Sequence, residues 1–213
     1  TFVFSSSCSV YGNTDTLPVT EDTPIKEAES PYARTKQICE QICFDVAKRH
    51  PEINIVILRY FNPAGAHESG LIGDLQIKPQ NVVPIITRTA IGKLDKMVVY
   101  GSDYPTRDGS CVRDYVHVMD IANAHTKSIE YVSENNYTIF NLGSGNGSTV
   151  FELINAFENS TNIKLNYVIG ERRDGDVIAV YSDSDKAFRE LGWKPRLGIN
   201  DMMISAWLWE NNQ

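Results

Sequence analysis

The amino-acid sequence predicts an α/β fold, in which strands and helices alternate along the 213 residues. Two observations lead to this prediction. The first is a set of short runs rich in Val, Ile and Phe, which are typical of strands buried on both faces of a parallel sheet. The second is a set of helix signals between these runs, such as Ser30-Pro31, where an N-cap residue precedes a proline at the first helical position.

Residues 1–58 predict a βαβ unit. A strand over 1–4 is followed by a polar turn segment, and a helix then runs from Pro31 to about Arg49, where His50-Pro51 ends it. The apolar run 53–58 predicts a second strand. Since a crossover between parallel strands is nearly always right-handed, the two strands should lie in one sheet on one side of this helix.

The remaining chain continues the alternation. Residues 62–84 are rich in Gly, Pro and polar side chains, which predicts a long functional loop. Helices are expected over 84–92, 120–133 (with Asp120 as N-cap), 149–159, 184–191 and 200–209, and strands over 97–100, 137–142 and 165–169. No internal repeat or low-complexity tract interrupts this order.

Composition and charge exclude several classes of protein. Hydrophobic residues make up 42% and charged residues 22%, which is ordinary globular usage and excludes disorder, collagen and coiled coil. The formal net charge of −7 argues against a nucleic-acid or anionic-membrane surface. The longest apolar run, 53–58, is far shorter than the roughly 20 residues of a membrane span. Four cysteines are too few for a disulfide scaffold and suggest a reducing compartment, the cytoplasm.

Two local patterns resemble functional motifs only partly. The run from Asn141 to Gly147 lies between an expected strand and helix, as a dinucleotide-binding loop does. Its third glycine, Gly147, however, lies two positions after the second, Gly145, where such a loop requires three. A tight turn is therefore favoured over a phosphate loop. Cys39 and Cys43 share a helix face, yet no second pair follows at zinc spacing. We expect packing thiols and no metal site.

The pair Tyr32 and Lys36 is the strongest catalytic candidate. Four residues apart, the two side chains lie on one helix face, near the carboxyl end of a buried strand where α/β sheets bind ligands. A tyrosine that acts as a base near neutrality must lower its pKa from about 10 to about 7, roughly 4 kcal/mol. One ammonium at about 4 Å contributes on the order of 4 kcal/mol at an effective dielectric constant of 20. The pair therefore predicts proton abstraction from an alcohol.

Ser7 adds a second group to this candidate. It follows the first strand directly, in the run Ser5-Ser-Ser7, and a hydroxyl at that strand end can reach the same substrate oxygen as Tyr32. A Tyr-x-x-x-Lys match alone is common, so an amphipathic helix with no function is the alternative that these serines argue against.

Several motifs together resemble the extended short-chain dehydrogenase/reductase family, and within it the UDP-hexose 4-epimerases. The resemblance covers essentially the whole chain. Its motifs are Phe4-Ser-Ser-Ser7 with Val10-Tyr11-Gly12, Pro31-Tyr32 to Lys36, Arg59-Tyr-Phe-Asn-Pro63-Ala-Gly-Ala-His67, Ser69-Gly-Leu-Ile-Gly73, Tyr100-Gly-Ser-Asp-Tyr-Pro105, Val112-Arg-Asp-Tyr-Val-His117, Asn141-Leu-Gly143 and Arg172-Arg-Asp-Gly-Asp176.

The resemblance implies a fold and a reaction. The fold is the C-terminal part of a Rossmann-like parallel sheet (residues 1–63, the remnant of an NAD-binding domain) plus a smaller α/β UDP-sugar-binding domain (64–213). The reaction is interconversion of UDP-glucose and UDP-galactose, in which Tyr32 takes the proton of the sugar 4-hydroxyl and hydride passes from C4 to NAD⁺ and back to the other face. Ser7 would bridge the sugar oxygen and Tyr32.

The resemblance also assigns binding residues. Ser7, Tyr32, Lys36, Tyr60 and Phe61 would contact the NAD cofactor. The UDP-sugar pocket would be lined by Asn62, Asn81, Val82, Val98, Tyr100, Arg113, Arg173, Asp176 and Val180. Arg113 and Arg173 suit the diphosphate, because guanidinium groups bind such oxygens bidentately.

One family feature is absent from this sequence: the Gly-rich phosphate loop in the first third of family members. The resemblance implies that roughly the first 115 residues of a family member have no counterpart in this sequence, so we expect this chain alone neither to hold NAD⁺ nor to convert UDP-galactose. Two other readings stay open. One is a different nucleotide-sugar epimerase or dehydratase, and the other is a truncated product that only binds UDP-sugar. The full parent is expected to be a homodimer.

Overall fold

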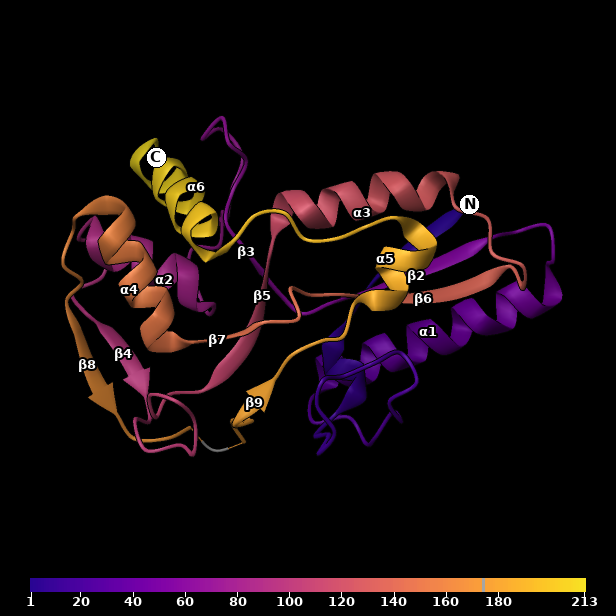
Figure 1. The fold of residues 1–213 in the computed structure, drawn as a ribbon, viewed down its shortest axis with the longest axis horizontal. Helices are drawn as coiled ribbons and strands as arrows, with labels where there is room; N and C mark the ends of the chain where they lie inside the picture. Colours follow the sequence, from indigo (N-terminus) through magenta and orange to yellow (C-terminus); the bar gives the residue numbers. More distant parts are fainter. Residues whose placement is uncertain (174) are drawn as a thin grey trace.

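The computed structural model describes residues 1–173 and 175–213, and it confirms the α/β fold. A three-stranded parallel sheet forms one end of the molecule, in the order β1-β2-β6 (Figure 1). Its strands are β1 (Phe2–Ser7), β2 (Ile55–Tyr60) and β6 (Tyr137–Leu142). The expected βαβ unit is present, with β1 and β2 side by side.

Helices cover both faces of this sheet. On one face lies α1 (Pro31–Arg49), and on the other lie α3 (Val118–Glu130) and α5 (Asp185–Leu191) (Figure 1). The alternation of β2 explains the two layers: Ile55 and Ile57 pack under α1, while Val56 and Leu58 pack under α3 and α5. Ser30 begins α1 as expected, since its side chain accepts a hydrogen bond from the backbone N–H of Ala33.

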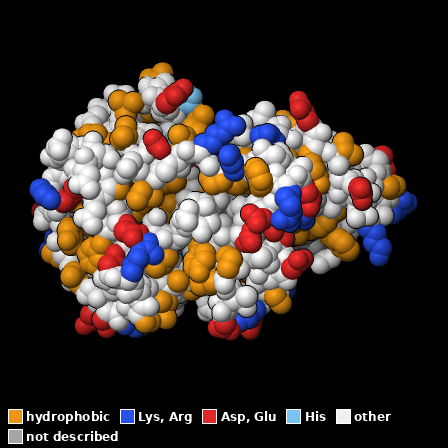
Figure 2. All heavy atoms as spheres, viewed as in Figure 1, with side chains coloured by type: hydrophobic (Ala, Val, Ile, Leu, Met, Phe, Trp, Pro, Cys, Tyr) orange, Lys and Arg blue, Asp and Glu red, His pale blue; other side chains and the backbone are white. Residues whose placement is uncertain are grey.

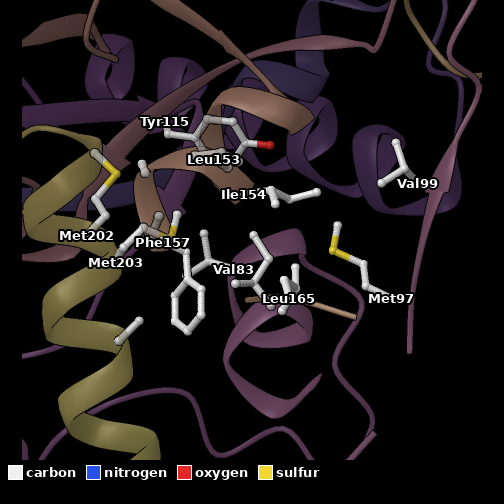
Figure 3. Packing of buried hydrophobic residues seen from close by; sticks show 14 residues of the cluster. Val83, Met97, Val99, Tyr115, Leu153, Ile154, Phe157, Leu165, Met202 and Met203 are labelled. Atoms are coloured by element: carbon white, nitrogen blue, oxygen red, sulfur yellow. The ribbon is translucent and has the colours of Figure 1, made fainter. Parts of the chain in front are cut away.

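The other end of the molecule has a separate helical core. It contains α2 (Val82–Ala90), α4 (Val150–Thr161) and α6 (Ile199–Asn211) beside the parallel pair β4 (Met97–Tyr100) and β8 (Tyr167–Gly170). Figure 3 shows Leu153 and Phe157 of α4 packed among Val83, Met97 and Met203. This core supports the inner wall of a pocket described below.

A mixed sheet joins the two ends. The long strand β5 (Val112–His117) pairs with β3 (Asn62–Ala64), β7 (Gly147–Thr149) and β9 (Ala179–Val180). A short 3-10 helix, η1 (Cys8–Tyr11), follows β1. The division at residues 63 and 64 stays a prediction, and the first sheet takes its third strand, β6, from beyond it.

Some elements differ from expectation. Residues 62–84 contain β3 and the start of α2, whose proline, Pro84, lies in the first turn, where the missing N–H is harmless. The N-cap of α3 is His117, which accepts from the N–H of Met119. The Asp120 side chain instead accepts from the N–H groups of Arg196 and Leu197, so the expectation that Asp120 is the N-cap was wrong.

Charge is spread over the surface. In Figure 2 acidic and basic side chains are interspersed over the viewed face. In the part of the chain that the structure describes, no helix has the length and apolar character to cross a membrane.

Candidate active site

Tyr32 and Lys36 lie at the carboxyl edge of the first sheet. Tyr32 stands in the first turn of α1 with 57% of its surface exposed. The Lys36 Nζ atom lies 5.6 Å from the centre of the Tyr32 ring and donates a 2.7 Å hydrogen bond to the carbonyl of Ser5. The expected neighbourhood of the two side chains is present, and the ammonium is held by the main chain of β1.

Ser7 ends β1 at the same edge. It pairs in register with Tyr60, and its Oγ accepts from the N–H of Ser9, so it is the N-cap of η1. The side chain is half-buried. The carboxyl edge of the first sheet therefore carries a hydroxyl (Ser7), a phenol (Tyr32) and an ammonium (Lys36). Their catalytic roles stay predictions.

Tyr60 and Phe61 lie at the end of β2, and neither is freely exposed. The Tyr60 hydroxyl is 2.7 Å from both Ser5 Oγ and His125 Nε2, and burial raises the pKa of Tyr60. Phe61 is 4% exposed and packs in a small cluster with Tyr11. A cofactor contact for these two residues stays a prediction. The polar cluster of Ser5, Tyr60 and His125 was not expected from the sequence.

A pocket with a cavity volume of about 200 Å³ lies beside the start of β3, at Asn62 and Pro63, next to the helical core. Eight of the nine residues expected to line a UDP-sugar pocket line it: Asn62, Asn81, Val82, Val98, Tyr100, Arg113, Arg173 and Asp176. These residues come from five separate segments between positions 62 and 176, and the fold brings them together. Asn62 follows Tyr60 by two residues, so the chain passes directly from the edge of the first sheet into the pocket wall.

Two guanidinium groups face this pocket, and each is held by a partner. Arg113 donates to the carbonyl of Val177 at 2.6 Å and to the Asp176 carboxylate at 3.2 Å. Arg173 stacks on the Tyr100 ring, with its central carbon 4.1 Å from the ring centre. Asp174, within the motif Arg172 to Asp176, lies outside the described residues. The pocket therefore combines two fixed cations with aromatic and aliphatic walls, which suits an anionic ligand with a planar group.

Val180 is not part of this pocket wall. It lies in β9, in register with Arg113, and packs against the cluster of Tyr11 and Phe61. It therefore stands between the carboxyl edge and the pocket. The further wall residues that the sequence reasoning missed are Pro63, Gln80, Val83, Ile85, Met97, Val99, Cys111, Tyr115 and Val150. Alternation along β5 would have placed Tyr115 beside Arg113, had that strand been expected.

The glycine-rich turn after β6 binds a carboxylate of the protein itself. Asp114, fully buried in β5, accepts from the N–H groups of Ser144 and Gly145 at 2.7 and 3.2 Å, and from the N–H of Ser182 at 2.9 Å. The hydroxyls of Ser144 and Ser182 donate to it as well. Because this carboxylate fills the turn, residues 143–147 form a tight structural turn and not a phosphate loop.

The described residues hold no cluster of three or more His, Cys, Asp or Glu side chains that could bind a metal ion. The four cysteines are free thiols, and burial raises the pKa of Cys8 to about 12 and that of Cys43 above its ordinary value. Such thiols are poor nucleophiles and poor metal ligands.

Comparison with known proteins gives consistent matches. The family model described as GDP-mannose 4,6 dehydratase matches residues 1–205. The UDP-glucose 4-epimerase of Haemophilus influenzae is 46% identical over 213 residues, and a bifunctional UDP-glucose 4-epimerase and UDP-xylose 4-epimerase of Pisum sativum is 47% identical over 214 residues. These matches cover 99% of this chain and 63% and 61% of the relatives, so the chain spans slightly less than two thirds of their length.

Solved structures agree. A UDP-glucose 4-epimerase from Stenotrophomonas maltophila, bound to NAD and a formylated UDP-arabinopyranose, superposes with a TM-score of 0.94 at 45% identity, covering 99% of this chain and 63% of that one. The Bifidobacterium longum enzyme, in complex with NAD⁺ and UDP, gives 0.91 at 45% identity over the same shares. The fold, the family model and the curated relatives agree: the chain belongs to the GDP-mannose 4,6 dehydratase family, within which its similarity is to UDP-glucose 4-epimerases.

Proposed function

We propose that this chain supplies the catalytic base and the nucleotide pocket of a UDP-hexose 4-epimerase, which interconverts UDP-glucose and UDP-galactose through transient oxidation at C4. One observation carries the proposal: the Tyr32–Lys36 pair stands at the edge of the first sheet, and the chain runs from that edge through Asn62 into a pocket with two guanidinium groups. A base and an anion pocket on one continuous wall suit a sugar attached to a diphosphate.

The chain's own residues perform the proton transfer. The Tyr32 phenolate takes the proton of the sugar 4-hydroxyl, and the Lys36 ammonium stabilises the negative charge of that phenolate. The Ser7 hydroxyl donates to the same sugar oxygen and orients it. When the sugar is reduced again at C4, Tyr32 returns the proton to the C4 oxygen.

The reaction implies a nicotinamide cofactor, and the residues present fit one end of it. Tyr32 is open to solvent, and Lys36 uses one of its three N–H groups on Ser5, which leaves donors for ribose hydroxyls. Ser7, Tyr32, Lys36, Tyr60 and Phe61 would hold that end, and NAD⁺ would accept the hydride of C4 and return it. The sequence holds no glycine-rich loop for the cofactor phosphates, so we expect this chain alone to bind NAD⁺ weakly.

The pocket binds the nucleotide in this proposal. Arg113 and Arg173 bind the diphosphate, and Tyr100 packs near the uracil. Asn62, Asn81, Val82, Val98 and Asp176 complete the wall, and Val180 lies at the sugar end. Residues 1–63, completed by β6, then act as the remnant of the cofactor domain, and 64–213 as the UDP-sugar domain.

We propose further that the parent protein is a cytoplasmic homodimer that binds neither nucleic acid nor membranes. The free thiols support a reducing compartment. The formal net charge of −7 disfavours polyanionic partners. Sedimentation of the purified parent measures the oligomeric state, and a monomer would contradict this part of the proposal.

The first experiment is calorimetry of the isolated chain with UDP and UDP-glucose. We expect binding, and a loss of affinity on the order of tenfold to a hundredfold for Arg113→Gln, because charged hydrogen bonds contribute about 1.5–3 kcal/mol. Arg172→Gln is the matched control, since Arg172 pairs with Asp103 and stacks on Tyr104 outside the pocket wall. If neither UDP nor UDP-glucose gave heat of binding, the proposal of a nucleotide pocket would be contradicted.

The second experiment tests the reaction. The chain is joined to the part of the Haemophilus influenzae relative that the match does not cover, which gives a protein that we call the joined enzyme. It is assayed for conversion of UDP-galactose to UDP-glucose. If the joined enzyme folds and binds UDP but releases a 4-keto-6-deoxy sugar or no product, the dehydratase or the binding-only reading is correct instead.

A further inference from the structure

We infer that Glu40 and Arg59 are positioning residues, whose buried ion pair fixes α1 against the ends of β1 and β2 and so holds Tyr32 and Lys36 in their reactive arrangement. The inference deepens the proposed function, because it concerns the same base. Its first test measures geometry and needs no catalytic activity.

The ion pair is fully enclosed and bidentate. Glu40 is 4% exposed and Arg59 is 2% exposed. Arg59 Nε donates to Glu40 Oε1 at 2.9 Å, and its terminal nitrogen donates to Oε2 at 2.5 Å. Burial opposes the charge of Arg59, but the hydrogen bonds and charge of Glu40, together with the interactions with Tyr11, outweigh it and raise the pKa of the guanidinium. Two parallel bonds between planar groups fix both distance and orientation.

The pair joins α1 to two of the three strands that end at the carboxyl edge of the first sheet, β1 and β2. Arg59 belongs to β2 and precedes Tyr60. Glu40 Oε1 also accepts a 2.5 Å bond from the hydroxyl of Ser6, the residue before Ser7 in β1. The Arg59 guanidinium lies 4.7 Å from the centre of the Tyr11 ring, which extends the network to η1. One carboxylate on α1 is therefore bonded directly to β1 and β2.

Glu40 and Lys36 act on β1 from the same face of α1. They are four residues apart, one turn of helix, and Lys36 bonds the carbonyl of Ser5 while Glu40 bonds the hydroxyl of Ser6. These two adjacent hydrogen bonds fix the rotation of α1 about its axis and the position of its first turns along β1. Tyr32, one further turn toward the N-terminus, has an exposed ring, so its place depends on the helix that carries it.

Stability alone does not account for this pair. Replacing a buried ion pair by apolar groups of similar volume is often neutral or stabilising, because desolvation offsets the attraction. Apart from the bonds of Glu40 and the bond of Lys36 to Ser5, the α1 contact with the sheet is apolar, through Cys43 and Ala47 against Ile55 and Ile57. Apolar contacts are non-directional, so they hold the helix on the sheet without fixing its register.

The test is the double substitution Glu40→Leu with Arg59→Met, which leaves no unpaired charge. In the isolated chain we expect the melting temperature of the double variant to stay within about 5 °C of that of the unsubstituted chain. The nuclear Overhauser effect between the Lys36 Hε protons and the Tyr32 ring should be lost, whereas that between Arg173 and the Tyr100 ring should persist. Gln41→Ala, on the exposed side of α1, is the control and should keep both.

In the joined enzyme the same double variant should lower kcat by at least 30-fold with KM for UDP-galactose unchanged within threefold. Retention of the Lys36–Tyr32 effect in the isolated chain would overturn the inference, whatever the joined enzyme does. A joined enzyme with no activity in its parent form would overturn the proposed function only. Loss of the Arg173–Tyr100 effect as well would show a general structural role and would also overturn the inference.

Discussion

The carboxyl edge of the first sheet and the pocket beside the helical core hold their side chains in different ways. At the edge, Tyr32 is exposed and its anchors are a backbone carbonyl and a buried ion pair one and two turns along α1. In the pocket, each arginine is fixed by its own partner, Arg113 by Asp176 and Arg173 by Tyr100. In the proposed function, the position of the base therefore depends on groups of α1 that lie behind it, whereas binding depends on side chains that line the pocket.

This difference has a consequence for substitutions. Changes at the edge should alter rate with little effect on nucleotide affinity, and changes in the pocket should do the reverse. The strand β5 is the exception, because Arg113 faces the pocket, Asp114 binds the turn after β6, and His117 begins α3. Changes in β5 should therefore affect the whole molecule.

Tyr32→Phe gives the largest expected effect. It removes the base while leaving the ring, so kcat of the joined enzyme should fall on the order of 10³-fold, about 4 kcal/mol. The UDP affinity of the isolated chain should not change. Initial rates and calorimetry measure the two quantities, with Tyr167→Phe of β8 as the control. A rate within tenfold of the parent would make the base assignment wrong, and a weaker UDP affinity would break the separation of the two regions.

Asp114→Asn should be strongly destabilising. The carboxylate accepts five hydrogen bonds while buried, and an amide NH₂ in its place would face the N–H groups of Gly145 and Ser182. We expect the free energy of unfolding to fall by about 3 kcal/mol. Urea unfolding measures it, with Asp95→Asn, an exposed residue, as the control. A loss below 1 kcal/mol would show that β5 does not hold the two regions together.

The pH dependence of stability should report His117. Burial lowers the pKa of His117, and its Nδ1 accepts from the N–H of Met119 while its Nε2 lies 3.0 Å from Ser205 Oγ. The unfolded chain then binds the proton more tightly than the folded chain. Stability is therefore fully present above the unfolded pKa of about 6.5 and is lost as pH falls below it through the lowered pKa of the folded chain.

The matched variant is His117→Asn, which keeps an N-cap side chain but does not titrate. Urea midpoints at pH 7.5 and 5.5 should fall less in this variant than in the parent chain. Equal losses in the two proteins would assign the acid sensitivity to other groups.

Sequence reasoning succeeded where structure depends on local pattern. The runs that form β2 and β6 are apolar because helices cover both faces of their sheet. Tyr32 and Lys36 are four residues apart, and this spacing alone places them on one face of a helix. It missed β5, which carries Arg113, Asp114 and His117 in a buried strand. Asp176, Ser182 and Ser205, each more than 60 residues away, are among the groups that satisfy those polar side chains, and no local pattern shows this.

The smallest expected effect is the loss of an exposed ion pair, which we compare with the loss of a buried one. Lys164 and Glu158 form an ion pair in which Lys164 is 90% exposed, so water and salt screen it. Lys164→Ala should change the free energy of unfolding by less than about 1 kcal/mol, and the change should shrink in 1 M NaCl. Arg59→Ala, by contrast, leaves the Glu40 carboxylate buried without its cation and should cost several times more, about 3–5 kcal/mol, with little salt dependence. Urea unfolding at low and high salt compares the two. If both variants lost the same amount, Glu40 would have reached solvent, and α1 would be free to shift on the sheet without its ion pair.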